Sequence, residues 1–208
     1  MPTQTFYNLP EEKRQKLLDA IHEEFSRVPF DDVSINQIIR LAGIPRGSFY
    51  QYFEDKQDLL QYLMADYRKV FKQHALASLE RTGGNLFQML LDIFDFTHAF
   101  VTEEKNNAFF KNLFSDIRVN IDFLHQQADG NTYDDFSAEL LPHIDMDSLD
   151  IRSKDDFGNM LGILLPLTGE AFARAFFDVS SYEHVRAQYS ARLDLLKRGL
   201  LKVKEAGT

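Results

Sequence analysis

The spacing of apolar residues constrains this chain more than any other feature of its sequence. Apolar side chains recur three or four residues apart along most of the 208 residues, and no convincing run alternates between apolar and polar residues. Three- and four-residue spacing places side chains on one face of an α-helix, whereas alternation indicates a strand. The sequence therefore predicts an all-α fold, with an N-terminal three-helix part joined to a larger helical domain.

Capping signals mark where several of these helices begin. Asn8 and Glu11 form a predicted capping box, in which each side chain accepts a hydrogen bond from the other residue's backbone N–H. Asp55 is expected to cap a longer helix. Ser180 with Glu183 predicts the start of the last helix. Helices with defined starts therefore follow one another along the chain, and no segment repeats another.

The most informative segment runs from residue 30 to residue 60. It consists of two predicted short helices joined by the tight turn Ala42-Gly43-Ile44-Pro45, and a longer helix follows at once. Gly43 permits the left-handed backbone that turns the chain, and Ser34 with Gln37 forms another predicted capping box. Two short helices across such a turn have the geometry that fits a helix into the major groove of DNA.

The second of these short helices carries unusual residues on its outside. Most of its side chains are able to donate hydrogen bonds to phosphates or base edges, whereas a solvated helix without a task more often carries Glu, Lys and Ala. The residues concerned are Arg46, Gly47, Ser48, Tyr50, Gln51 and Tyr52. Gly47 is a poor helix former, but its missing side chain would let the helix approach DNA closely. This set predicts a DNA-reading surface.

The stretch from Val33 to Lys56 is more specific than a generic helix-turn-helix. It contains a Ser helix cap, four isoleucines, Ala-Gly at the turn and the pattern Gly-x-x-Tyr-x-Tyr-Phe, and a Lys and a Leu follow that pattern. These features resemble the DNA-binding signature of TetR-family regulators. Pro45 departs from that signature, because a Ser with a capping side chain is common there. The resemblance covers residues 9–60 strongly and the rest only as an all-helical outline.

The resemblance implies a role for each matching position. Phosphate contacts are implied for Ser34, Tyr50 and Lys56. Positions nearest the bases are implied for Arg46, Ser48 and Gln51, with Tyr52 on the edge of that surface. The alternative is that both tyrosines only pack the three-helix core. That role is more expected of Phe49 and Phe53, which lie four residues apart.

The resemblance also implies a two-part organisation. We expect a helix-turn-helix DNA-binding domain at residues 1–55 and a helical ligand-binding and dimerisation domain at residues 56–208. The sequence itself has its clearest break at Gly83-Gly84, which predicts a domain boundary near that point. The larger part is rich in Phe, so a cavity in it would be apolar and aromatic. A Phe-rich core without a cavity explains the same residues almost as well. Candidate ligand-binding residues are Phe94, Thr97, Phe110, Phe114 and Glu170.

The last two helices are candidates for a subunit interface. The final helix has an apolar stripe with three- and four-residue spacing, which is typical of a helix packed in a bundle. The stripe consists of Tyr182, Val185, Tyr189, Leu193, Leu196 and Leu200. Gly158, Gly162 and Gly169 give the preceding helix small faces for close approach. The alternative is that both helices only complete the core of one chain. The resemblance implies instead a homodimer whose recognition helices meet successive major grooves of a palindromic operator.

Composition narrows the possible functions. The net charge of −9 argues at first against a nucleic-acid partner, but residues 1–80 hold 10 basic and 12 acidic side chains, so most of the negative excess lies elsewhere. The chain has no Cys, and its six His form no pair at metal-ligand spacing, so no metal site is expected. No nucleophile–base arrangement and no phosphate-binding glycine loop is apparent, so neither an enzyme nor a cofactor is expected.

The N-terminal and apolar segments bear on location. The first residues lack the basic start and apolar core of a signal peptide. The most apolar stretch, residues 161–177, contains Glu170 and Arg174 and is short for a membrane span. We therefore expect a soluble cytoplasmic protein that has no membrane partner.

These features combine into one expected function. It is a TetR-type repressor that binds a DNA operator as a homodimer and is released by a small, largely apolar or aromatic effector. The rival is a helical ligand- or partner-binding protein of the same fold without operator-specific DNA binding, which the low positive charge of the N-terminal part supports. A DNA reader should lose affinity steeply as salt rises, so salt dependence separates the two.

Overall fold

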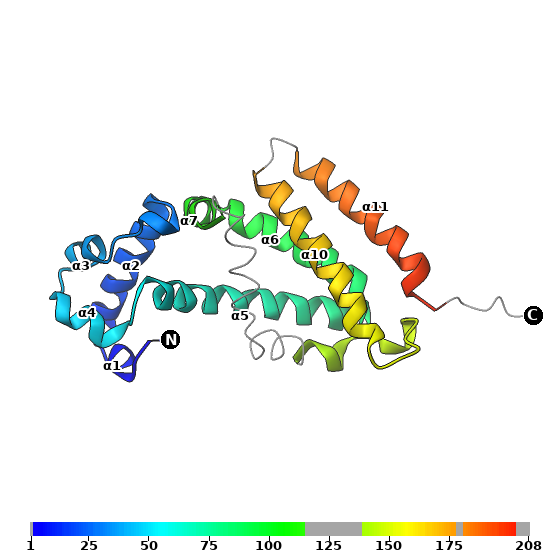
Figure 1. Cartoon of the computed structure of the whole chain (residues 1–208), viewed down its shortest axis with the longest axis horizontal. Helices are drawn as coiled ribbons and strands as arrows, with labels where there is room; N and C mark the ends of the chain where they lie inside the picture. Colours follow the sequence, from blue (N-terminus) through cyan, green and yellow to red (C-terminus); the bar gives the residue numbers. More distant parts are fainter. Residues whose placement is uncertain (1, 115–138, 178–180, 203–208) are drawn as a thin grey trace, which may run out of the picture. The chain divides into compact units, whose positions relative to one another are not determined.

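The computed structural model describes residues 2–114, 139–177 and 181–202, and Figure 1 shows their helices in chain order. Across these ranges every regular element is helical, apart from an isolated antiparallel bridge that joins Leu149 to Leu201. The predicted all-α class is confirmed. None of the helices in these ranges is long and apolar enough to cross a membrane.

The elements up to residue 52 are mostly short, and longer helices follow them. The first group contains α1 (Gln4–Tyr7), α2 (Glu11–Arg27), the 3-10 turn η1 (Phe30–Asp32), α3 (Ile35–Ala42) and α4 (Arg46–Tyr52). The second group contains α5 (Lys56–Thr82), α6 (Leu86–Thr102), α7 (Glu104–Phe114), the 3-10 turns η2 (Leu141–His143) and η3 (Met146–Ser148), α10 (Asp156–Phe177) and α11 (Tyr182–Leu200).

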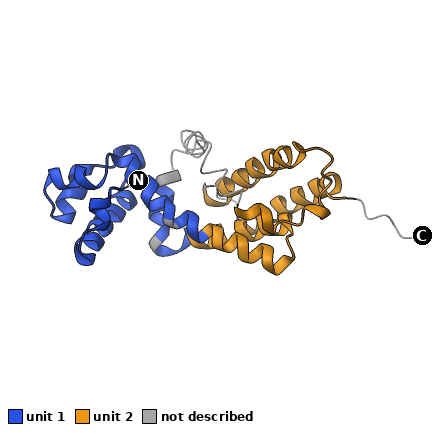
Figure 2. Cartoon of the chain, turned by 90° about the horizontal axis from the view of Figure 1, so that it is seen from below, with its two compact units in different colours: residues 1–70, 101–125 blue, residues 71–100, 126–208 orange. Residues whose placement is uncertain are grey.

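The chain divides into two compact units, which Figure 2 colours separately. The first unit comprises residues 1–70 and 101–125, and the second comprises residues 71–100 and 126–208. The helices α5 and α6 therefore each contribute to both units. The expected boundary after residue 55 does not coincide with the limits of these units, and the division into two functional domains stays a prediction.

Apolar residues of α2, α3 and α4 form the core of the first unit. The helix α2 packs against α3 and α7, and α1 packs against α4. Ile21, Ile38, Phe49 and Phe53 are completely buried. Phe49 on α4 and Phe53, the extended residue directly after α4, are both buried in this core. The expectation that these two phenylalanines pack the core is confirmed.

The helix starts partly correct the sequence-based predictions. Asn8 does not cap α2, because it ends the short helix α1, which the apolar pattern did not reveal, and Pro10 stands at the N-cap of α2. Asp55 does cap α5: its Oδ1 accepts a hydrogen bond of 2.9 Å from the N–H of Asp58. The last helix is capped by Ser181, whose Oγ accepts from the N–H of His184, and the predicted cap Ser180 lies outside the described residues.

The core of the second unit lies among α5, α6, α10 and α11. Phe94 and Leu164 are completely buried, and Tyr189 is nearly so. The hydroxyl groups of Tyr189 and Thr168 lie 2.8 Å apart, which satisfies both polar groups inside an apolar core. At the side of this core, Asp95 of α6 accepts hydrogen bonds from Arg186 and Tyr182 of α11. Burial, reinforced by the Asp95 carboxylate, raises the pKa of Tyr182 to about 12.

The predicted break at Gly83-Gly84 ends α5. Both residues have positive φ, 64° and 85°, which favours glycine. The carbonyl of Gly84 accepts a hydrogen bond of 2.9 Å from the N–H of Asp145. A Cβ on Gly84 would lie 2.4 Å from that same nitrogen. Gly84 is therefore required both by its backbone conformation and by the close approach of the segment around Asp145.

Candidate nucleic-acid interface

The helices α3 and α4 are joined by the predicted tight turn. Ser34 is the N-cap of α3, and its Oγ accepts a hydrogen bond of 3.4 Å from the N–H of Gln37. Gly43 ends α3 in the left-handed conformation, with φ at 66°. Pro45 is the extended N-cap residue of α4 and offers no capping side chain. The two short helices therefore form the helix-turn-helix that the sequence predicts.

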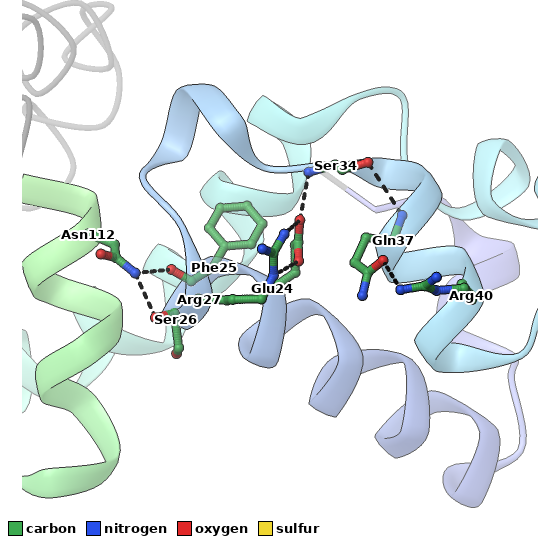
Figure 3. A network of polar contacts seen from close by, with 8 residues as sticks. All are labelled: Glu24, Phe25, Ser26, Arg27, Ser34, Gln37, Arg40 and Asn112. Carbon is green, nitrogen blue, oxygen red and sulfur yellow. Dashed lines mark hydrogen bonds and ion pairs between the residues drawn. The ribbon is translucent and has the colours of Figure 1, made fainter.

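A buried carboxylate fixes the start of α3, as Figure 3 shows. Glu24 of α2 is fully buried, and its Oε1 accepts a hydrogen bond of 3.0 Å from the N–H of Ser34. Arg27 donates to both carboxylate oxygens of Glu24, at 2.8 and 2.9 Å. The side chain of Gln37 accepts from Arg40 instead of completing the predicted capping box. Glu24 therefore supplies the acceptor expected from Gln37.

The charge of Glu24 depends on these contacts. Burial by itself raises the pKa of the carboxyl group, because a low-dielectric surrounding disfavours the ionised form. The hydrogen bonds from Arg27 and from the N–H of Ser34 act in the opposite direction, and the pKa of Glu24 lies below its ordinary value. Glu24 is therefore ionised at neutral pH and holds α2 to the start of α3 by charge-assisted hydrogen bonds.

A second polar contact joins α7 to the end of α2 (Figure 3). The Nδ2 of Asn112 donates to the carbonyl oxygen of Ser26 at 2.6 Å and to that of Phe25 at 3.4 Å. These carbonyls belong to the last turn of α2, where backbone acceptors lack partners within the helix. Asn112 therefore satisfies the end of the helix whose buried Glu24 fixes α3.

The exposed face of α4 carries the predicted DNA-contacting residues. Arg46, Gly47, Tyr50 and Gln51 are exposed, whereas Ser48 and Tyr52 are half-buried. A Cβ added to Gly47 would meet open space, so nothing in the protein obstructs a close approach to this part of the helix. Tyr50 is 47% exposed beside the completely buried Phe49. Because nearly half of its surface is open to solvent, Tyr50 does more than pack the core, contrary to the alternative interpretation.

Arg46 is held in place on this face by two partners. Its Nη1 donates to Oδ1 of Asn36 at 2.9 Å, and its Nη2 donates to the hydroxyl of Tyr50 at 3.4 Å. The guanidinium also lies 5.7 Å from the centre of the Tyr50 ring. Asn36 comes from α3, so it links the two helices at their surface. Sequence reasoning did not single out Asn36, although its place in the first turn of the first helix of the predicted helix-turn-helix is a usable signal.

Tyr52 and Lys56 differ from the simple expectation of a contact surface. The ring of Tyr52 lies edge-on to Phe6 of α1, with ring centres 6.4 Å apart, so this side chain partly packs the protein. The Nζ of Lys56 donates to the carbonyl oxygens of Phe30 at 3.2 Å and Asp31 at 2.8 Å. Its ammonium also lies over the Phe30 ring. Lys56 therefore anchors η1 to the start of α5 in this structure.

The predicted ligand-binding residues are distributed over both units. Phe94 is completely buried in the second unit and packs against Phe172, Tyr182 and Tyr189. The hydroxyl of Thr97 donates to the carbonyl of Ile93 at 2.6 Å.

The other three candidates have different surroundings. Glu170 is exposed and forms ion pairs with Arg192 at 2.9 Å and with Arg174 at 3.9 Å. Phe110 is buried in the first unit against Tyr67 and Phe109. The side chain of Phe114 lies outside the described residues. Neither unit by itself therefore brings the candidate set together.

The apolar stripe of α11 has a different role from the one its spacing suggested. Val185, Tyr189 and Leu193 are buried in the core of the second unit within one chain. The alternative that this stripe completes the core of the monomer is therefore correct for these residues. The helices α10 and α11 pack against each other, and their other faces are exposed. A subunit interface on these helices must use those outer faces.

A metal site is not indicated in the part of the chain that the structure describes. No cluster of three or more His, Asp or Glu side chains there has the geometry to hold a metal ion.

Two family models match separate parts of the chain. Residues 17–63 match the sequence model of bacterial regulatory proteins of the tetR family, and residues 85–200 match that of the tetracyclin repressor-like C-terminal domain. The second match covers more than half of the chain. The protein therefore belongs to the TetR family, whose members are helix-turn-helix transcriptional regulators and not enzymes.

Individual relatives agree with this assignment. The HTH-type transcriptional regulator SrpR of Pseudomonas putida is 38% identical over 66 residues, which are 32% of this chain and 29% of that protein. The alignment thus spans less than a third of SrpR. An HTH-type transcriptional regulator of Staphylococcus aureus is 26% identical over 148 residues, or 62% of this chain and 76% of that protein. The solved structure of a TetR-like transcriptional regulator from Rhodococcus sp. RHA1 shares the fold, with a TM-score of 0.53 at 18% identity over 92% of this chain and 100% of that one.

Proposed function

We propose that this protein is a homodimeric repressor that binds a palindromic operator through α3 and α4. A small, largely apolar or aromatic effector in the second domain releases it from DNA. The observation that carries the proposal is the division of α4 into two faces. Phe49 on one face is completely buried, while Arg46, Tyr50 and Gln51 on the other are exposed. An exposed row of hydrogen-bond donors, directly after a tight turn, suits the major groove.

The exposed residues divide into two kinds of contact. Arg46, Ser48 and Gln51 read base edges, and Tyr52 borders them. Ser34, Tyr50 and Lys56 position the protein on phosphates. The tethers to Asn36 and Tyr50 occupy two of the five N–H donors of the Arg46 guanidinium. The remaining donors suit the acceptor pair of a guanine, which is the commonest specific contact of arginine.

The dimer forms through the outer faces of α10 and α11. On α10, a Cβ on Gly158, Gly162 or Gly169 would meet open space. Ile163 of α10 is 50% exposed and Leu195 of α11 is 60% exposed. Small residues allow two helices to approach closely, and exposed large apolar side chains gain by being covered. A four-helix arrangement of two such pairs sets two recognition helices on one palindrome.

Effector release requires two states with different affinities. The effector must bind better to the form that does not hold DNA, and DNA must then weaken effector binding by the same factor. Aromatic side chains supply the apolar surface that such a ligand needs. In the second unit, half-buried Phe71 of α5 is in ring contact with Phe96 and Phe100 of α6, and His74 stacks on Phe96.

A genomic-fragment selection with the purified full-length protein at near-physiological salt tests the proposal. Recovery of one short palindrome, bound by a dimer in a subsequent titration, is the expected result. Recovery of random fragments alone, with weak binding that salt abolishes, contradicts operator recognition and favours a protein that binds a ligand or partner instead.

A pair of matched lysine variants refines the test. Removing one lysine–phosphate interaction reduces the slope of log affinity against log salt by about 1. Lys56→Ala should therefore reduce that slope, while Lys69→Ala should not, although both lysines lie on α5. Equal slopes for the two variants contradict the assignment of Lys56 to phosphate.

A further inference from the structure

The segment before α2 lies outside the part of the chain that the family model matches, which begins at residue 17. In this structure the segment contacts the C-terminal end of α4, which is the recognition helix of the proposed function. The N–H of Thr3 donates to the carbonyl oxygen of Tyr52 at 3.0 Å. The hydroxyl of Thr3 donates to the carbonyl oxygen of Gln51 at 2.5 Å. One residue thus satisfies two carbonyls at the last turn of α4.

The helix α4 has few other means of holding its shape. It has seven residues, and isolated helices of fewer than about 12 are marginal in water. Gly47, a poor helix former, lies in its first turn, and its N-cap, Pro45, makes no side-chain capping bond. Its C-cap, Phe53, is extended with φ at −134°, so no left-handed glycine closes that end. The last carbonyls of α4 therefore depend on a hydrogen-bond donor from elsewhere in the chain, and Thr3 provides it.

A buried ring fixes Thr3 in position. Phe6 of α1 is completely buried, and its ring centre lies 4.9 Å from that of Phe53 and 5.2 Å from that of Tyr62. The ring centre of Tyr52 lies 6.4 Å from that of Phe6. Phe6 therefore holds α1 against the end of α4 and the second turn of α5. The hydrogen bonds of Thr3 are made by an anchored segment and not by a loose terminus.

We propose that residues 2–8 position the recognition helix for DNA. Thr3 caps its C-terminus, and Phe6 anchors the cap, so that Gln51 and Tyr52 keep the helical geometry in which they face DNA. This inference rests on the proposed function. Thr3 is a positioning residue, since it acts through the backbone of α4 and the proposal gives it no contact with DNA.

An experiment can distinguish this positioning role from a direct contact with DNA phosphates, because of the residues that the segment contains. Residues 2–8 contain no charged side chain. A change within them removes no phosphate-binding cation, so the salt dependence of DNA binding stays the same. Affinity for the specific site, which depends on the placement of base-reading side chains, falls. Non-specific affinity does not change.

Three threonine variants of the full-length protein test the proposal against the palindromic duplex recovered by the genomic selection. Thr3→Val removes the hydroxyl donor while keeping the shape of the side chain, and it should weaken specific binding about 5-fold. Thr3→Ser keeps the donor and should bind within about 2-fold of the unchanged protein. Thr5→Val makes the same chemical change at an exposed position of α1 and should leave affinity unchanged.

Amide hydrogen exchange of the same variants without DNA gives a second readout. Thr3→Val should speed exchange in α4 and leave exchange in α2 unchanged, because the missing cap frays only the helix that it closes. General destabilisation would instead speed exchange in both helices, and that result would overturn the positioning role.

Two outcomes separate this inference from the function on which it rests. If the unchanged protein binds no duplex specifically, the proposed function fails, and the inference fails with it. If the unchanged protein binds its palindrome and Thr3→Val binds as tightly as Thr5→Val, only the positioning role of Thr3 is overturned. A smaller salt slope for Thr3→Val also overturns it, because that result indicates a phosphate contact.

Discussion

The helix α4 and the core of the second unit use their aromatic residues in different ways. In α4 the rings are divided between two faces, since Phe49 is completely buried and its neighbour Tyr50 is 47% exposed. In the second unit, Phe94 is completely buried and stacks with Phe172 and Tyr182. A seven-residue helix has room for one packing face, so its other side chains are available for recognition. Longer helices enclosing a larger core use most of their rings for packing.

This contrast explains why aromatic content alone is a poor guide to a ligand site. A single exposed aromatic residue is ordinary on a protein surface, so the exposure of Tyr50 is informative only together with the exposed hydrogen-bond donors Arg46 and Gln51 on the same helix. A buried aromatic residue needs no reason beyond packing. The interface of α3 and α4 is therefore supported by its exposure, whereas the candidate ligand residues are supported only by their type.

The largest expected effect is on the free energy of unfolding, and it distinguishes a buried aromatic ring from an exposed one. Phe94→Ala leaves a cavity in the core of the second unit and should lower the free energy of unfolding by about 3–5 kcal/mol. Tyr50→Ala should change it by no more than about 0.5 kcal/mol, as is usual for surface substitutions. Urea unfolding followed by circular dichroism measures both. Similar decreases in the free energy of unfolding for the two variants would contradict the proposed difference between buried and exposed rings.

Arg46→Ala should weaken DNA binding and leave the stability of the protein almost unchanged. Operator affinity should fall by about 1–3 kcal/mol, and discrimination at one base pair should relax, because a base-reading arginine is removed. Stability should change little, since the guanidinium is exposed and its partners are surface groups. Titration against a set of duplexes with single base-pair changes measures this. A uniform decrease in affinity across all duplexes would reassign Arg46 to phosphate.

Glu24→Gln tests the buried carboxylate that supports α3. The pKa of Glu24 is lowered in the folded protein, so its ionised form stabilises the fold above the ordinary value of 4.5, and this contribution disappears as pH falls through the folded value. At neutral pH the variant should be less stable by about 1–2 kcal/mol, because charge-assisted hydrogen bonds are removed. The difference should be constant near neutral pH and should shrink as the pH falls below about 4.5 in urea unfolding curves. A difference that does not vary with pH contradicts the role assigned to the charge.

The smallest expected effect has opposite signs for stability and for binding. Gly47→Ala should raise the free energy of unfolding by about 0.5–1 kcal/mol, because alanine favours the helix and its Cβ meets open space. Operator affinity should nevertheless fall if α4 approaches DNA closely at this position. Thermal unfolding and a DNA titration of the same preparation measure the two effects. Unchanged affinity would mean that Gly47 lies away from the DNA.

Local rules predicted several features of the structure correctly, although the capping box expected at Asn8 was wrong. Rules that involve residues within about one helical turn predict the caps at Ser34 and Asp55 and the left-handed turn at Gly43. Each of these three predictions is confirmed. The positions of Phe49 and Phe53 follow from helical periodicity in the same way.

Contacts between distant residues were not accessible to such rules. Glu24 replaces Gln37 as the partner of Ser34, ten residues away, and Thr3 meets Gln51 across 48 residues. For the same reason the stripe of α11 could not be assigned to a subunit interface or to the core of one chain. Its three- and four-residue spacing is identical in both cases, and only the fold shows that Val185 and Leu193 are buried within the monomer.

Amide hydrogen exchange with and without the recovered palindromic duplex tests the central claim most directly. If α3 and α4 form the DNA-reading surface, protection on DNA binding should concentrate in residues 34–56, and α10 and α11 should show no comparable change. Protection confined to the second unit, or absent from α4, would contradict the assignment of the exposed face of α4 to DNA recognition.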